Sequence, residues 1–437
     1  MNYFNNKKIH NIDKGKSEEI LKIALNFNLI MIYFIEKNIK WPLISWLILL
    51  FTIKNELCAQ IQIINEDTAV DMALNYYPQV KLSNLQVEQQ NLLKPASFNL
   101  SAPELLFQAP TGNQMRPGVL QHFDYPGVYN QQIQLQKEAS SLSERQRDIN
   151  FNQLKYNVRN TFIEFQYWHE KSIVLKRFDS IFSDLVTINE VRYRVGQISN
   201  LEKIGGETRY KNLQFQKLQS EAELTRSRKQ LLIYMGSPND TILYPDNKLK
   251  KYDPLLIISS DTSVLRQNPM NRYYTQHISY AKRALKVEKA KSYPGGIVGW
   301  LNQASPSTKT YYRLEYGLTL PIWFWQYKSK INAAKKGVEI SESQSILINY
   351  QLNGEYYQAQ SRYKQYSDGL KYYEQAGLLQ AAEVLKSAAT SYRLGSISYY
   401  VYLQNIEQAF TIELNYLEAL KNYNQSILYL KYLKGEL

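Results

Sequence analysis

Side chains that perform nucleophilic or metal chemistry are sparse in this sequence. The 437 residues include one Cys and four His, which excludes a multi-Cys zinc or iron–sulfur site and disfavours a His-built metal centre. The pairs Gly205-Gly206 and Gly295-Gly296 lack the context of a phosphate-binding loop, and no nucleophile elbow, Walker loop or HExxH motif occurs. We therefore expect no enzymatic activity and no cofactor or metal.

One short motif is instead repeated, and its residue types suit a turn between two helices. Residues 193–199, YRVGQIS, return as residues 392–398, YRLGSIS. The glycine permits a sharp reversal, the serine is a good N-cap for the returning helix, and an arginine near a helix C-terminus is favoured by the helix dipole. Two roles stay open for the arginines: support of the turn itself, or contact with the backbone or acidic groups of a docking partner. The candidate docking residues are Arg194, Val195, Gly196, Ser199, Arg393, Leu394, Gly395 and Ser398.

The motif is part of a duplication of most of the chain. Three further landmarks recur in the same order: Asp124-Tyr125-Pro126 with Thr319-Leu320-Pro321, Asn75–Pro78 with Gln267–Pro269, and Met235-Gly236 with Lys434-Gly435. A repeat of this size is a domain-sized hairpin rather than one turn of a solenoid. We predict a first repeat over residues 60–236, a linker over 237–258 and a second repeat over 259–437.

Each predicted repeat contains the same elements. They are a first helix (66–93 and 259–291), a β-hairpin (96–125 and 295–320), a long helix (129–195 and 325–393) and a last helix (199–235 and 398–433). At about 1.5 Å per residue a long helix reaches roughly 100 Å, and the two shorter helices placed end to end would match it. The fold class is mainly α with a small β part.

The last helix of each repeat carries apolar residues at coiled-coil spacing. The first seam comprises Leu201, Ile204, Phe215, Leu218, Ala222 and Leu232, and the second comprises Leu403, Ile406, Phe410, Leu417, Leu420 and Ile427. Polar residues interrupt both seams, which favours helices that contact neighbours on two sides. A single two-stranded coiled coil is the simpler alternative for either helix.

The segment before the second long helix alternates strictly. Tyr312, Leu314, Tyr316 and Leu318 share one face of the predicted strand, and Arg313 and Glu315 share the other. An apolar outward face and a polar inward face are typical of a membrane β-strand, and the cluster Trp323-Phe324-Trp325 suits a bilayer interface. The alternative is a soluble hairpin packed on a helix. Four strands leave open edges that a bilayer does not tolerate, so closure requires copies of the chain, and three copies give twelve strands.

The N-terminus and the charge indicate export rather than nucleic-acid binding. The apolar run Trp41–Ile53 is shorter than the roughly 20 residues that span a bilayer, and it suits a signal peptide within residues 1–59, starting at Met31 and cleaved after Ala59. An uncleaved membrane anchor is the alternative. The formal net charge of +13 is spread over mixed-sign helix faces without a basic stripe, so we expect no nucleic-acid partner.

Together, the duplicated helices, the Pro126 and Pro321 landmarks and the paired turns at 194–199 and 393–398 resemble the TolC-like outer-membrane efflux proteins of Gram-negative bacteria. The resemblance implies a homotrimer with an α-helical coiled-coil barrel in the periplasm and a 12-stranded transmembrane β-barrel in the outer membrane. It also implies that the two turns form a periplasmic tip, which meets an adaptor (membrane fusion) protein coupled to an inner-membrane pump, with an RND-type pump expected.

The function implied by the resemblance is a passive exit duct of a tripartite efflux or type I secretion system. Glu202, Tyr399, Tyr400 and Tyr402 are candidates for closing the tip, but acidic residues are scarce near the second turn, so a cation-binding acidic ring is not expected. The alternative from another class is a periplasmic coiled-coil scaffold or adaptor anchored to the inner membrane. That alternative explains the helices but not the alternation at 312–320. The exported substrate stays open.

Overall fold

The computed structural model describes residues 61–108, 116–236, 242–254, 262–302 and 312–437. The predicted signal peptide, both hairpin loops and part of the predicted linker lie outside these ranges, as does the side chain of Tyr312. Except for Ile61 and Ile242, the described residues belong to one compact unit. Within the described ranges, no helix combines the length and the hydropathy needed to cross a membrane.

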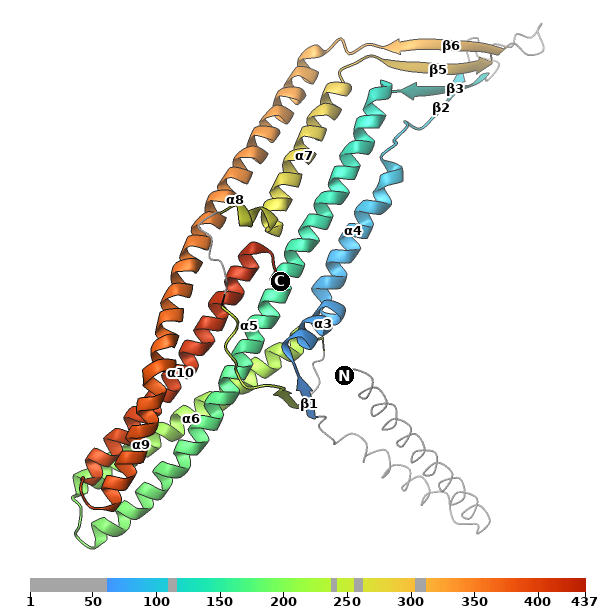
Figure 1. Cartoon of the computed structure of the whole chain (residues 1–437). Helices are drawn as coiled ribbons and strands as arrows, with labels where there is room; N and C mark the ends of the chain where they lie inside the picture. Colours follow the sequence, from blue (N-terminus) through green and yellow to red (C-terminus); the bar gives the residue numbers. More distant parts are fainter. Residues whose placement is uncertain (1–60, 109–115, 237–241, 255–261, 303–311) are drawn as a thin grey trace, which may run out of the picture. The chain divides into compact units, whose positions relative to one another are not determined.

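Long helices dominate both halves of this unit (Figure 1). The first half contains α3 (Glu66–Tyr76), α4 (Pro78–Ala96), α5 (Pro126–Arg194) and α6 (Asn200–Tyr234). The second half contains the 3₁₀ helix η1 (Thr262–Gln267), α7 (Pro269–Ala290), α8 (Phe324–Tyr372), the π-helix η2 (Tyr373–Gly377), α9 (Leu378–Arg393) and α10 (Tyr399–Lys434). The prediction of a mainly α fold with a small β part is confirmed.

Three of the predicted helices are interrupted. Within the described residues, the helix expected over 259–291 consists of η1 and α7, with a break at Asn268, the residue before Pro269. The helix expected over 66–93 breaks at Tyr77, whose backbone is extended because the following Pro78 disfavours a helical conformation at the residue before it. The long helix expected over 325–393 contains the π-turn η2 between α8 and α9. A π-turn inserts one residue into the helical repeat and changes which side chains face a neighbour. Here Glu374 of η2 lies 2.7 Å from the ammonium of Lys251, outside the helix.

Four strands form one antiparallel sheet in the order β2-β3-β5-β6. The strands are β2 (Glu104–Gln108), β3 (Arg116–Phe123), β5 (Gly295–Asn302) and β6 (Tyr312–Thr319). The first hairpin is therefore shorter than the predicted 96–125, since Ala96 still belongs to α4. A separate two-stranded sheet pairs β1 (Ile61–Ile64) with β4 (Ile242–Pro245).

Helix α5 is the interior element of the helical layer. Towards the sheet it packs between α4 and α7, and towards its C-terminus it packs between α6 and α10. Helix α8 lies beside α7 and then α10, and α9 continues beside α10. The helices α4 and α6 on one side, and α8 and α9 on the other, are therefore the edges of the layer. In Figure 1 the sheet lies at one end of these helices and the two turns lie at the other.

The sequence landmarks of each repeat meet where two short helices follow one another. In the first half, a Cβ added to Gly236 would lie 2.7 Å from the Cβ of Tyr76, at the junction of α3 and α4. In the second half, a Cβ on Gly435 would lie 2.9 Å from the carbonyl oxygen of Gln267, and Asn268 donates a hydrogen bond to the Leu433 carbonyl at 2.8 Å. Both glycines have positive φ, so each junction needs glycine for conformation and for space.

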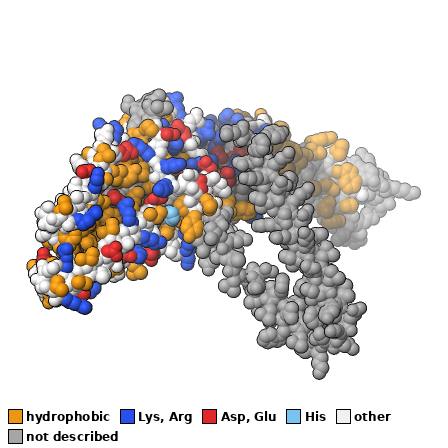
Figure 2. Space-filling view, turned by 60° about the horizontal axis from the view of Figure 1, so that its bottom comes forward, with side chains coloured by type: hydrophobic (Ala, Val, Ile, Leu, Met, Phe, Trp, Pro, Cys, Tyr) orange, Lys and Arg blue, Asp and Glu red, His pale blue; other side chains and the backbone are white. Residues whose placement is uncertain are grey.

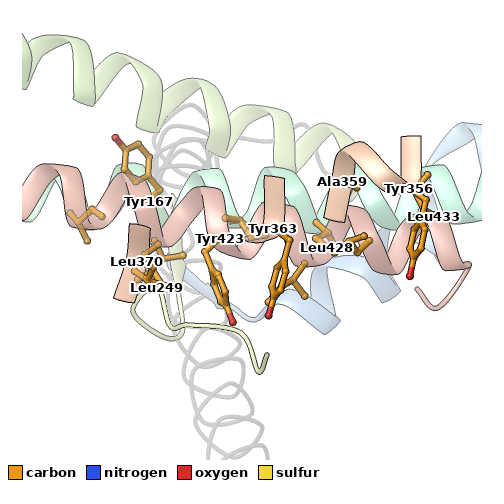
Figure 3. Close-up of a cluster of buried hydrophobic side chains, with 14 of the residues drawn as sticks. Tyr167, Leu249, Tyr356, Ala359, Tyr363, Leu370, Tyr423, Leu428 and Leu433 are labelled. Carbon is orange, nitrogen blue, oxygen red and sulfur yellow. The ribbon is translucent and has the colours of Figure 1, made fainter. Parts of the chain in front are cut away.

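Three buried apolar clusters hold the layer together. The largest joins α5, α8 and α10, and Figure 3 shows Tyr363 and Tyr423 side by side within it, with ring centroids 5.7 Å apart. A second cluster joins α3, α5 and α6 around Phe162 and Met235. A third lies towards the turns, around Phe178 and Phe410. Because α5 contributes to all three, it is the element on which both halves pack.

Candidate functional site

The first repeated motif forms a tight turn between α5 and α6. Gly196 has a φ of 74°, and the amides of Gly196 and Gln197 donate to the carbonyls of Tyr193 (3.0 Å) and Arg192 (2.8 Å). This pair of bonds is the Schellman arrangement, which satisfies the last carbonyls of a helix. Ser199 then caps α6 and forms a reciprocal capping box with Glu202. The carboxylate of Glu202 is therefore hydrogen-bonded within the first turn.

The second motif has the same backbone. Gly395 also has a φ of 74°, its amide donates to the Tyr392 carbonyl at 3.1 Å, and the amide of Ser396 donates to the Ser391 carbonyl at 2.9 Å. Ser398 caps α10 through the amide of Val401, 3.4 Å away, but Val401 stands where the first turn has Glu202, so no capping box forms. The duplicated motif thus produces two equivalent turns with unequal side-chain support.

Charges in the first turn are paired within the chain. The carboxylate of Glu190 lies 3.1 Å from Arg194 and 2.5 Å from Lys203. Hydrogen bonds from Lys203 and then Arg194 lower the pKa of Glu190, and the same contact with Glu190 raises the pKa of Lys203. Arg194 and Val195 are exposed. Arg194 therefore lies at the surface in an ion pair with Glu190 one helical turn away, and Glu207, 3.9 Å from Lys203, supplies the second carboxylate that balances the two cations.

The second turn is built on tyrosines instead. The guanidinium of Arg192 donates to the Tyr392 hydroxyl at 2.5 Å and lies 5.0 Å from the centre of that ring. Tyr392 stacks on Tyr402 with ring centroids 4.5 Å apart and planes 5° apart. Arg393 and Leu394 are exposed beyond this stack. Of the tip-closing candidates, Tyr402 belongs to the stack and Tyr400 is exposed, with Arg209 over its ring.

Near the two turns, a glycine of α6 is in close contact with a tyrosine of α10. Tyr399 is buried, and its hydroxyl would lie 2.6 Å from a Cβ added to Gly206. Burial is the main cause that raises the pKa of Tyr399 to about 12. The neighbouring Gly205 has open space around its Cβ position. Gly206 is therefore required for the close approach of the two halves, whereas Gly205 is not.

The sheet has its large exposed apolar side chains on one face and its charged side chains on the other. Residues directly opposite in an antiparallel pair share a face, and the register aligns Leu105 with Val119, Val119 with Trp300, and Trp300 with Leu314. Continuing in steps of two adds Phe107, Val298, Tyr316 and Leu318 to this apolar face. Tyr316 is 77% exposed and Leu318 76% exposed, so the chain itself leaves this face uncovered.

The opposite face carries the charged groups, whereas the same register puts the uncharged polar residues Gln121 and Asn302 on the apolar face. Arg313 and Glu315 lie on this opposite face, as does the pair His122–Glu104, with 3.5 Å between imidazole and carboxylate. Two leucines on this face fold over glycines of the neighbouring strand. A Cβ on Gly118 would lie 2.2 Å from Leu301, and one on Gly299 would lie 2.1 Å from Leu120. The glycines leave the space that these two leucine side chains occupy.

The two predicted coiled-coil seams have different surroundings. Every residue of the second seam, on α10, is buried. On α6, Leu201, Ile204, Phe215 and Leu218 are exposed, and the helix packs on α5 through the opposite stripe of Gly206, Leu213, Ser220 and Ser227. The first seam therefore does not form an intrachain contact, apart from Leu232, which is buried. Figure 2 shows broad hydrophobic areas between charged groups on the helical surface.

Several contacts at these sites were absent from the sequence-based prediction. Pairing of Glu190 with Arg194 could have been read from the sequence, because the two residues are one helical turn apart, whereas its contact with Lys203 joins α5 to α6 and has no such spacing. The contacts Arg192–Tyr392 and Gly206–Tyr399 join the two halves and carry no local signal. Within the described residues, no group of three or more His, Cys, Asp or Glu is placed to hold a metal ion.

Comparison with known proteins places this geometry in a known fold. No protein-family model and no curated protein sequence matches the chain. Among solved structures, the outer-membrane channel OprN superposes with a TM-score of 0.73 at 13% identity, over 85% of this chain and 90% of OprN. The chain has the fold of outer-membrane channels.

Other channels share the fold to the same extent. The CmeC outer-membrane channel of Campylobacter jejuni has a TM-score of 0.70 at 17% identity, over 85% of each chain. The open MtrE outer-membrane channel of Neisseria gonorrhoeae has a TM-score of 0.71 at 15% identity, over 85% of this chain and 88% of MtrE. Since these identities are low, the likeness establishes the fold, and the arrangement of helices and sheet in this chain carries the functional argument.

Proposed function

We propose that the chain is the outer-membrane exit duct of a tripartite efflux or type I secretion system, and that it conducts substrates passively as a homotrimer. The sheet spans the outer membrane and the helices extend into the periplasm. A periplasmic adaptor docks at the turns and couples the duct to an inner-membrane pump of the RND type. The energy for export comes from the pump, so the duct needs no catalytic residue.

The observation that carries this proposal is the uncovered apolar face of the sheet. Leu105, Phe107, Leu314, Tyr316 and Leu318 are all exposed on one face, while Arg313 and Glu315 lie on the other. A soluble protein that left this face in water would be prone to aggregation. In lipid the same face is favourable, and the polar face lines an aqueous passage.

The strand order supports an oligomer. In the described chain, β2 and β6 are the outer strands, and each pairs with only one neighbour. Unpaired backbone groups cost several kcal/mol each in a bilayer, so β2 of one copy must pair with β6 of the next. The helix edges support the same contact, since α6 is exposed on one side of the layer and α8 and α9 on the other.

The aromatic side chains between the sheet and the helices indicate where the proposed membrane boundary lies. Trp323, Phe324 and Trp325 are exposed directly after β6, and Tyr293 lies exposed before β5 with its ring 5.0 Å from that of Tyr125. Trp and Tyr concentrate at bilayer–water interfaces. This belt therefore suits the periplasmic boundary of the membrane, between sheet and helices.

Single-channel recording in planar bilayers tests the proposal. The purified protein should produce stepwise conductance, and it should migrate as a three-chain species after cross-linking. The variant Tyr316→Arg puts a charge on the apolar face at a cost of about 2–4 kcal/mol and should abolish insertion. The matched variant Glu315→Arg adds the same side chain to the polar face and should still insert. A monodisperse, water-soluble monomer without conductance would exclude the proposal and favour the scaffold alternative.

A further inference from the structure

The two turns differ most in the charges around their arginines. In the first turn, Glu190 binds both Arg194 and Lys203. At the positions that correspond relative to the turn glycines, the second half has Ala389 in place of Glu190 and Tyr402 in place of Lys203. Arg393 is exposed, and within the described residues no carboxylate forms an ion pair with it. The second turn thus presents a cation that the chain does not neutralise.

The surroundings of Arg393 form a firm surface. Tyr392, the residue before Arg393, stacks on Tyr402, and Arg192 of the first half donates a hydrogen bond of 2.5 Å to Tyr392. Burial and the neighbouring Tyr392 raise the pKa of Tyr402, whereas the charge of Arg393 opposes this rise, which indicates that the guanidinium lies near the phenol. Residues of both halves therefore hold the stacked Tyr392 and Tyr402, the side chains that neighbour Arg393.

Apolar side chains border the cation. Leu394, Tyr400 and Val401 are exposed at the same turn. Val401 occupies the position that Glu202 holds in the first turn, so one substitution between the halves removes a carboxylate and adds an apolar contact. A binding group that complements this surface has a carboxylate next to an aliphatic side chain. Arginine suits such a carboxylate because its guanidinium can donate two parallel hydrogen bonds.

We propose that Arg393, Leu394, Tyr400 and Val401 form the charge-reading half of the docking end and bind an acidic segment of the partner protein, while the first turn contacts the partner without contributing net charge. This inference rests on the proposed function, because the partner is the adaptor of the export system. It assigns unequal roles to two turns whose backbones are equivalent. The two kinds of turn alternate around the proposed trimer, so the partner should place an Asp or Glu against each second turn and not against the first turns.

A matched pair of neutralising variants tests the assignment. The probe is the purified periplasmic adaptor of the same bacterium, and the measurement is its affinity for the full-length duct in detergent at several salt concentrations. Arg393→Gln should weaken binding about tenfold or more, since a hydrogen bond to a charged group contributes about 1.5–3 kcal/mol. Arg194→Gln should change the affinity less than about twofold, because Glu190 already neutralises Arg194. Added salt should weaken wild-type binding more than binding by Arg393→Gln.

Charge reversal identifies the group that Arg393 reads. Arg393→Glu should bind more weakly than Arg393→Gln, and an Asp-to-Lys or Glu-to-Lys change in the adaptor should restore its binding. Equal losses for Arg393→Gln and Arg194→Gln, or no loss for either, would overturn the proposal. A change in trimer stability or basal conductance with unchanged adaptor affinity would also overturn it, and would place the carboxylate on another copy of this chain. Failure of the proposed function is distinguishable, because the wild-type chain would then show no conductance.

Discussion

Helices α6 and α10 are the last helices of the two halves, and they carry the same apolar spacing in different surroundings. Leu403 of α10 is 1% exposed, whereas Ile204, at the same position relative to its turn glycine, is 49% exposed. Leu417 and Leu218 form a second equivalent pair, with 9% and 66% exposed. The duplicated pattern is therefore covered once within the chain and left uncovered once.

The reason lies in the position of each helix in the layer. Helix α10 has α5 on one side and α8 and α9 on the other, while α6 packs mainly on α5. Towards the turn, the face that α6 packs on α5 consists mostly of small residues, Gly206, Ser220 and Ser227, with Leu213 among them, and large apolar side chains follow only near its C-terminus at Leu231 and Leu232. The difference fits the proposed homotrimer, in which a sister chain would cover the apolar seam that α6 leaves exposed.

Truncation of equivalent side chains on α6 and α10 should produce the largest difference in unfolding free energy. Leu403→Ala removes a fully buried side chain and should lower the free energy of unfolding of the detergent-solubilised single chain by about 2–5 kcal/mol. Ile204→Ala should change it by less than about 0.5 kcal/mol, because the side chain is exposed in the single chain. Thermal unfolding of dissociated chains, followed by circular dichroism, measures both. Equal losses would mean that α6 is buried within the chain.

A charge on the exposed seam should act on assembly rather than on the single chain. Leu218→Asp should prevent trimer formation in detergent, since burying a leucine contributes about 1.5–3 kcal/mol and an unpaired buried carboxylate adds a further cost. The far-ultraviolet circular dichroism spectrum should remain helical. Size-exclusion chromatography with light scattering reports the mass, and Gln219→Asp, at an exposed position on another face of the same helix, is the control. A trimer of unchanged stability would show that this seam faces solvent.

Two adjacent glycines of α6 test the point at which α6 and α10 are in contact. Gly205→Ala should stabilise the chain by up to about 1 kcal/mol, since it adds a better helix former in open space. Gly206→Ala drives a methyl group against the buried hydroxyl of Tyr399 and should cost about 1–3 kcal/mol relative to Gly205→Ala. Adding Tyr399→Phe removes that hydroxyl and should recover most of the loss. Denaturant unfolding of the wild type, Gly206→Ala, Tyr399→Phe and the double variant provides the cycle, and a loss that Tyr399→Phe does not recover would contradict the assigned contact.

The smallest expected effect is a pH dependence that only the first turn should show. Because Lys203 and Arg194 lower the pKa of Glu190 below its ordinary value of 4.5, their ion pairs stabilise the first turn above that value and are lost as the pH falls through the lowered pKa. The second turn has Ala389 at this position and no such dependence. Carbon-13 NMR of labelled glutamate should give a Glu190 midpoint below 4.5 that rises in Lys203→Met. An unchanged midpoint in that variant would show that Lys203 does not hold the carboxylate.

Much of the fold could be predicted from the sequence because its strongest signals are periodic. The turn glycines, the serine N-caps and the alternation at 312–319 act over a few residues, and the structure has turns, caps and a strand there. The break at Tyr77 was missed although Pro78 gives a local signal for it, whereas η2 was missed because a run of helix-compatible residues does not reveal where packing interrupts it. The exposure of Leu218 was not predictable either, since identical spacing on α6 and α10 gives no indication of which helix lies at an edge.

Disulfide formation between the two helix edges is the most direct test of the central claim that sister chains cover them. Phe215 on α6 and Leu379 on α9 are both exposed and lie at similar distances from their turns along the helices, while α5 and α10 separate them within one chain. In a Cys58→Ser background, Phe215→Cys combined with Leu379→Cys should yield a three-chain species on oxidation that reductant converts to single chains. Only single chains after oxidation, in a preparation that still conducts ions, would contradict the account.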